Sequence, residues 1–113
     1  MAGRAIWSVA ETKQVHLPRL DGLRPTLEST ALKVMEEAGE LGAAIGKVRG
    51  LSGERVDLDE RAAIHHVAEE LLDVAQTAVT MMFVLEDSYG VEIGKIVEAH
   101  VQKLVRKGYL RQA

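Results

Sequence analysis

The chain has 113 residues, of which 47% are hydrophobic, and a formal net charge of −3. This length predicts one domain, residues 1–113, that is large enough to bury a hydrophobic core. The absence of cysteine excludes disulfides and thiol chemistry, and an acidic chain is poorly suited to binding nucleic acid. The longest apolar run, Val74–Leu85, is too short and too polar to span a membrane. Because the N-terminus also lacks the apolar stretch of a signal peptide, we expect a cytoplasmic protein.

Residues 1–25 form the least regular part of the sequence. Arg4–Val15 is predicted to form a short helix, with Trp7 as one of its packing residues. Leu17–Pro25 is expected to be a connection, because each of its two prolines disfavours helix in the residue before it.

Helical periodicity dominates the rest of the chain, and no strand-like alternation competes with it. Pro25 and Thr26 suit a helix start, whereas Gly50 and Gly108 suit helix ends. The three helices predicted from these signals span residues 25–49, 60–88 and 91–107.

The segment Gly50–Leu58 is predicted to be a loop, and Asp57–Glu60 after it has the pattern of a capping box. Short connections make consecutive helices antiparallel neighbours. The predicted fold is therefore all-α, an antiparallel bundle of three long helices plus a short N-terminal helix.

An acidic block occurs twice, as Met35–Glu40 and as Ala68–Asp73. Each block has an apolar residue, two glutamates, two small or apolar residues, and an acid. Successive residues of a helix are separated by about 100°. If the apolar stripes are centred on Ala38 and Leu71, then Glu37 and Glu70 lie about 100° to one side, and Glu40 and Asp73 about 160° to that side.

Acids spaced three residues apart lie on adjacent turns of a helix, within reach of one ion. Antiparallel packing would bring the pair Glu37 and Glu40 opposite the pair Glu70 and Asp73, at the margin of the core. Carboxylate oxygens favour Mg²⁺ or Mn²⁺ over zinc, and such a metal indicates phosphate chemistry. Glu36 lies at the edge of this group, and Glu69 is expected to be solvated.

Two other interpretations of the acidic blocks remain. Acids on long helices are commonly a solvated face, often with a base four residues later, but Glu36, Glu40 and Glu69 have none there. A di-iron bundle would need Glu-x-x-His on two helices, and neither block contains it. His66, four residues before Glu70, is either an outer ligand or an ordinary exposed histidine.

At these residues the sequence resembles the MazG-like all-α nucleoside triphosphate pyrophosphohydrolases. The family signature is E-E-x-x-E followed one helix later by E-x-x-D. Here Lys33–Leu41 carries the first motif and Glu69–Val74 the second, and a basic end of the last helix follows. The resemblance covers about Leu27–Tyr109, which is most of the chain.

The resemblance implies cleavage of a nucleoside triphosphate between its α and β phosphates, without a covalent nucleophile. It implies Mg²⁺, with Mn²⁺ as a substitute, and assembly as a homodimer or homotetramer. The implied metal ligands are Glu37, Glu40, Glu70 and Asp73. Glu36 would assist a second ion or the attacking water, and either Glu36 or Glu40 would take the proton of that water.

Basic residues are expected to contact the phosphates. The candidates are Lys33, Lys103, Arg106 and Lys107. Lys103 corresponds best to the family pattern, whereas Lys107 stands about where the family has Asn. Cations near a helix C-terminus are also favoured by the helix dipole alone. The residues that bind the base are not identified, since Trp7 is suited either to stacking on a base or to packing.

Two alternatives to a general nucleotide pyrophosphohydrolase stay open. The related phosphoribosyl-ATP pyrophosphohydrolases share both acidic motifs, but their typical Tyr-His after the aspartate is absent, because Asp73 is followed by Val74–Thr77. The other alternative is a non-catalytic helical interaction or regulatory module, whose acids are surface charge.

Overall fold

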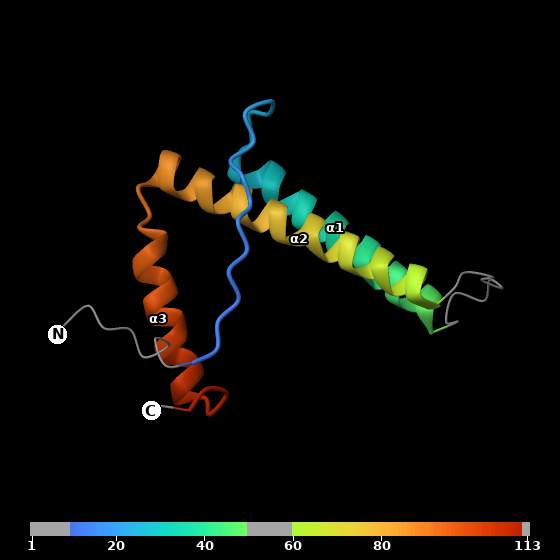
Figure 1. Ribbon diagram of the computed structural model, residues 1–113. Coiled ribbons are helices and arrows are strands. Elements are labelled where there is room, and N and C mark those ends of the chain that lie inside the picture. Colours follow the sequence, from blue (N-terminus) through green and yellow to red (C-terminus); the bar gives the residue numbers. More distant parts are fainter. Residues whose placement is uncertain (1–9, 50–59, 112–113) are drawn as a thin grey trace.

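Three helices, seen in a computed structural model, make up the regular structure of the part described, residues 10–49 and 60–111. They are α1 (Leu27–Val48), α2 (Glu60–Tyr89) and α3 (Ile93–Arg106) (Figure 1). No strand occurs within these residues, which confirms the all-α prediction for them. None of the three helices is long and apolar enough to cross a membrane. The predicted Gly50–Leu58 loop and all but the last residue of the Asp57–Glu60 capping box lie outside the described residues.

The start of α1 is fixed by a reciprocal cap. The Thr26 hydroxyl accepts a hydrogen bond from the backbone N–H of Ser29 at 3.0 Å, and the Ser29 hydroxyl accepts one from the N–H of Thr26 at 2.9 Å. Two N–H groups that the helix cannot satisfy are thus paired. The predicted start at Pro25 or Thr26 is confirmed.

Glycines end the other two helices. Gly90 after α2 and Gly108 after α3 adopt φ values of +65° and +80°, a left-handed region that is costly for other residues. At the end of α3, the N–H of Gly108 donates to the carbonyl of Val105, and the N–H of Tyr109 donates to the carbonyl of Leu104. This pattern is a Schellman motif, which closes the C-terminus of α3. The prediction that Gly108 ends this helix is confirmed.

The helices α1 and α2 lie antiparallel, side by side along most of their length, whereas α3 turns away from the end of α2 (Figure 1). Among the helices, α3 contacts only α2. The radius of gyration is 17.6 Å, against about 13 Å for a compact domain of this length. The antiparallel bundle is therefore confirmed for α1 and α2, but it is wrong for α3 within one chain.

The segment before α1 is not helical where it is described, from residue 10 onward. The predicted helix Arg4–Val15 is thus wrong for residues 10–15, while its first part and Trp7 lie outside the described residues. A short helix is marginal unless it buries an apolar face, and residues 11–16 are all exposed. The segment instead crosses α2, where the Pro18 carbonyl accepts a hydrogen bond from Gln76 Nε2 at 2.9 Å.

The face of α1 that packs against α2 is partly polar. Residues seven apart lie two turns apart on one face of a helix. The three buried residues of α1 are spaced seven apart, and they are Thr30, Glu37 and Ala44. On α2 the half-buried Glu70 lies seven residues after the buried Ala63 and fourteen before the buried Val84. The interface is therefore centred on Glu37 and Glu70.

This result corrects the predicted apolar stripes by one residue. Ala38 and Leu71, taken as the centres of those stripes, are both exposed. Met35 is 72% exposed and Leu71 50% exposed. Other large apolar side chains of the three helices are also exposed in the single chain: Ile45, Ile64, Leu72, Met82, Ile96 and Val97. One residue corresponds to about 100° of helix rotation, so Glu37 and Glu70 face inward, whereas Ala38 and Leu71 face outward.

We expect Thr26→Ala to lower the free energy of unfolding by about 1 kcal/mol, because it removes the acceptor for the Ser29 N–H. Urea denaturation followed by circular dichroism would measure the change. Thr12→Ala, at an exposed position outside any helix, should change it little. An equal loss in both variants would mean that the cap does not stabilise α1.

Candidate metal centre

Three carboxylates from two helices converge between α1 and α2. One oxygen each from Glu37, Glu70 and Asp73 lies within 4.8 Å of the others. Glu37 is on the face of α1 that packs on α2, and Glu70 and Asp73 lie on adjacent turns of α2. The group therefore depends on both the three-residue spacing and the packing of the two helices.

Burial leaves part of this group without a partner. The side chain of Glu37 is 8% exposed and that of Glu70 is 15% exposed. Glu37 Oε2 and Glu70 Oε2 are buried and accept no hydrogen bond in the described structure. A buried carboxylate oxygen without a partner is costly, and a bound cation is the simplest partner for two of them together.

The charges around the group are mainly negative. Lys33 Nζ lies 3.0 Å from Glu37 Oε1, and this hydrogen bond raises the pKa of Lys33. The negative charge of Glu37 raises the pKa of the Glu40 carboxyl, and desolvation and the charge of Glu70 add to the effect. One ammonium thus faces three clustered carboxylates, a balance that favours a divalent cation.

Histidine adds a polar contact at the rim of the group. His66 Nε2 lies 3.5 Å from Glu70 Oε1, the oxygen opposite the unpartnered Oε2. His65 and His66 both lie 3.9 Å from the exposed Glu69. The histidines therefore contact the edge of the acidic group, and neither belongs to the three-residue cluster.

The other predicted site residues lie in two different places. Glu36 is exposed, 4.0 Å from Lys33 Nζ. Glu40 is also exposed and is not one of the three clustered carboxylates, although it lies within their negative field. Lys33 contacts Glu37 of the cluster. The bases at the end of α3 do not reach the cluster, because α3 makes no contact with α1 in the same chain. These bases are Lys103, Arg106 and Lys107.

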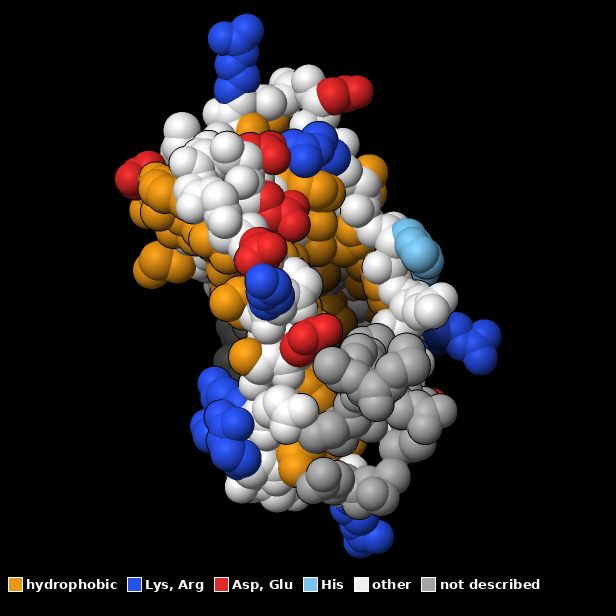
Figure 2. Space-filling model, turned by 90° about the vertical axis from the view of Figure 1, so that its left-hand side faces the viewer, with side chains coloured by type: hydrophobic (Ala, Val, Ile, Leu, Met, Phe, Trp, Pro, Cys, Tyr) orange, Lys and Arg blue, Asp and Glu red, His pale blue; other side chains and the backbone are white. Residues whose placement is uncertain are grey.

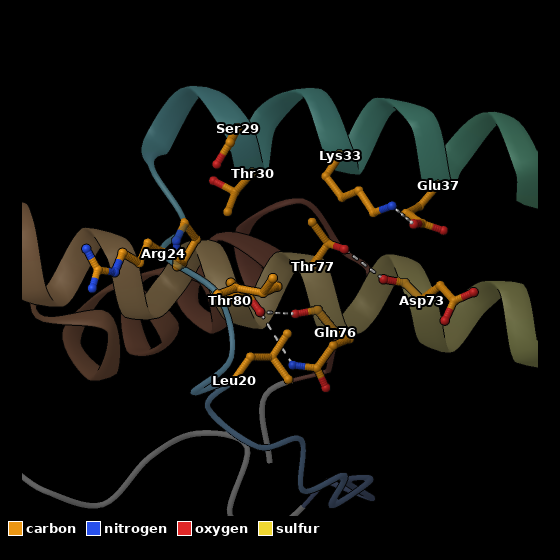
Figure 3. A pocket seen from close by; sticks show the side chains of 12 residues that line it. Leu20, Arg24, Ser29, Thr30, Lys33, Glu37, Asp73, Gln76, Thr77 and Thr80 are labelled. Atoms are coloured by element: carbon orange, nitrogen blue, oxygen red, sulfur yellow. Dashed lines mark hydrogen bonds and ion pairs between the residues drawn. The ribbon is translucent and has the colours of Figure 1, made fainter.

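A pocket of about 520 Å³ extends from the acidic cluster. Figure 3 shows Glu37 and Asp73 at one end and Arg24 at the other, with Leu20 on the side of the N-terminal segment. We call these the acidic end and the Arg24 end. The complete lining is Leu20, Leu23, Arg24, Pro25, Ser29, Thr30, Lys33, Glu37, Asp73, Gln76, Thr77 and Thr80.

Polar residues of α2 that the sequence analysis did not assign to a site line this pocket. The Thr77 hydroxyl donates to the Asp73 carbonyl at 3.1 Å, and the Thr80 hydroxyl donates to the Gln76 carbonyl at 2.9 Å. The Thr80 oxygen also accepts from Gln76 Nε2 at 3.4 Å, and the Thr77 oxygen retains capacity to accept. The available signal was the occurrence of Gln76, Thr77 and Thr80 within the apolar run Val74–Leu85.

The donor set fits a hard divalent cation. All three clustered ligands are carboxylates, and oxygen ligands with room for water are what Mg²⁺ and Mn²⁺ bind. The unpartnered oxygens of Glu37 and Glu70 would be satisfied by such an ion. The open pocket beside them leaves space for a ligand that shares the metal.

Neutralising Glu70 tests whether these carboxylates are held together against repulsion. In EDTA at pH 8, we expect Glu70→Gln to raise the melting temperature by roughly 5 °C, because its amide can donate to a neighbouring carboxylate. Added Mg²⁺ should raise the melting temperature of the unmodified protein but not that of the variant. Glu98→Gln, which makes the same charge change at an exposed position of α3, should leave both responses intact. A variant that melts lower in EDTA and still responds to Mg²⁺ would contradict a cation site.

A family model described as the MazG nucleotide pyrophosphohydrolase domain matches residues 25–108, which include all three helices. Searches of curated proteins and of solved structures gave no significant match.

Proposed function

Because the chain belongs to the MazG nucleotide pyrophosphohydrolase family, we propose that it is a Mg²⁺-dependent enzyme that converts a (deoxy)nucleoside triphosphate to monophosphate and pyrophosphate. We place this activity in the cytoplasm, with surplus or non-standard nucleotides as substrates. The observation that carries the proposal is the pair of buried, unpartnered carboxylate oxygens beside an open pocket.

In this proposal Glu37, Glu70 and Asp73 hold the metal. A bound Mg²⁺ would neutralise phosphate oxygens and lower the pKa of a coordinated water. Glu40 lies one turn after Glu37 on α1 and would complete the ligand set or take the proton of that water. Glu36, exposed beside Lys33, is the other candidate for the proton or for a second ion.

The two ends of the pocket differ in charge, and this difference would orient a bound nucleotide. Phosphates would lie at the acidic end, where the metal offsets the carboxylates and Lys33 supplies a further positive charge. The nucleoside would extend toward the Arg24 end, between Leu20 and Thr80. Pockets of about 300–1,000 Å³ accommodate ligands of this size, so 520 Å³ suffices for a nucleoside.

We propose that the working unit is a homodimer or a homotetramer. On α1 the strongly exposed Leu32 and Met35 share a face with Gly39 and Gly42, and no atom lies within 4 Å of a Cβ added at either glycine. On α2 the exposed Ile64, Leu71 and Met82 also lie along one face.

Exposed apolar stripes on two neighbouring helices are an arrangement that a second copy can bury. On the face at the α3 side of the molecule, Figure 2 shows further hydrophobic side chains exposed between charged ones. The helix α3 does not reach α1 in its own chain. If Lys103, Arg106 or Lys107 contacts the phosphates, those phosphates would therefore lie at the acidic cluster of another subunit.

The activity is tested by measuring pyrophosphate release from a panel of ribo- and deoxynucleoside triphosphates, with phosphoribosyl-ATP included. We expect release with Mg²⁺ or Mn²⁺ and none in EDTA. Glu37→Gln and Asp73→Asn should each lower kcat/KM at least about a hundredfold, because each removes a metal ligand. Glu98→Gln should retain full activity. No release from any member of the panel, together with no Mg²⁺ binding by calorimetry, would favour the non-catalytic module.

The assembly is tested by light scattering after gel filtration. Met35→Glu and Leu71→Glu place charges in the exposed stripes, and we expect each to shift the protein toward a smaller species. Val15→Glu, at an exposed apolar position of the N-terminal segment, serves as the matched control. A monomeric unmodified protein would overturn the proposed assembly.

A further inference from the structure

The segment Leu17–Pro25 lines two hollows. One is the 520 Å³ pocket with the acidic end, and the other is a cavity of about 210 Å³. Both hollows are lined by Leu20, Leu23, Pro25 and Thr80. The segment is therefore a wall that the two hollows share at the Arg24 end of the pocket.

Polar contacts from α2 hold this wall. The Arg19 guanidinium donates to both carboxylate oxygens of Asp87, at 2.5 and 3.4 Å. The same guanidinium lies over the ring of Phe83, 4.1 Å from its centroid. One residue earlier, the Pro18 carbonyl accepts from Gln76 Nε2 at 2.9 Å. We call the Arg19, Asp87 and Phe83 group the clasp.

Packing does little to fix the wall independently of the clasp. Leu20 and Leu23 are both exposed, and the 210 Å³ cavity leaves space beside them. An exposed ion pair normally contributes little to the stability of a whole protein. Here only Leu17 and Pro25 of the segment are even half-buried, so the clasp and the Gln76–Pro18 hydrogen bond have a large share in deciding where the segment lies.

The clasp also has the geometry of a specific contact. A guanidinium that binds both oxygens of a carboxylate is restrained in direction as well as in distance. Stacking on Phe83 fixes the plane of the same group. The hydrogen bond from Arg19 lowers the pKa of the Asp87 carboxyl, so the contact favours the charged form of that group.

We propose that Arg19 is a positioning residue that holds Leu17–Pro25 against α2 as the wall of the nucleoside end of the pocket. This inference rests on the proposed function. Arg19 lines the 210 Å³ cavity and not the substrate pocket, so it acts through Leu20 and Leu23. Loss of the clasp should weaken nucleotide binding and leave the metal and the bond-breaking step unaffected.

Steady-state kinetics on the preferred nucleotide would test the proposal. We expect Arg19→Ala to raise KM about tenfold with kcat nearly unchanged, which is the signature of lost binding without lost chemistry. Arg19→Lys should give an intermediate KM, because it keeps the charge but not the two-point contact. Lys13→Ala, an exposed change on the same N-terminal segment, should match the unmodified protein.

A charge reversal provides the stricter test. Arg19→Asp alone should raise KM at least as much as Arg19→Ala, and adding Asp87→Arg should recover most of the loss. Circular dichroism would verify that each variant is folded. Unchanged KM in Arg19→Ala, or a fall in kcat that the double reversal does not restore, would overturn the positioning role.

Limited proteolysis separates this proposal from the enzymatic one. Chymotrypsin should cleave after Leu20 or Leu23 faster in Arg19→Ala than in Lys13→Ala, whether or not any nucleotide is hydrolysed. Equal cleavage in the two variants would show that the clasp does not hold the wall. If cleavage differs but no nucleotide is hydrolysed by the unmodified protein, the clasp stands and the proposed activity fails.

Discussion

The packing of Glu37 on α1 against Glu70 on α2 is the constraint on which the rest of the structure depends. Two helices would ordinarily meet through their apolar stripes, yet here the centre of the interface carries two acids whose Oε2 atoms have no partner. Such an interface is costly by itself. It becomes favourable when a cation lies between the helices, so folding energetics and the proposed catalysis draw on the same atoms.

The inward position of the acids explains why so many apolar side chains lie outside. Rotating the helices to place Glu37 and Glu70 between them exposes Met35 and Leu71. α3 does not cover these residues, because it turns away from the end of α2 (Figure 1). The single chain thus leaves apolar surface exposed, and the proposed assembly with further copies would bury what the interface between α1 and α2 does not cover.

The substrate pocket depends on a segment without regular structure. A third helix packed over α1 and α2 would fill the space beside the acids. Instead the N-terminal segment crosses α2 as a strap, fixed through Arg19 and the Pro18 carbonyl, and leaves a pocket of 520 Å³. Nucleotide binding as proposed would therefore require a segment without regular structure to be held in place, which is the role proposed for the clasp.

The sequence by itself determined the helices, their caps and the acids that form the candidate site, because these depend on local periodicity, turn chemistry and spacing. Thr26 and Gly108 each lie at a helix boundary as predicted. Tertiary structure alone decided which face of each helix is inward, since an error of one residue rotates a helix by about 100°. It also decided that Arg19 contacts Asp87, 68 residues away in the chain, and that α3 turns away from α1 and α2. No local pattern encodes contacts between segments so distant in the chain.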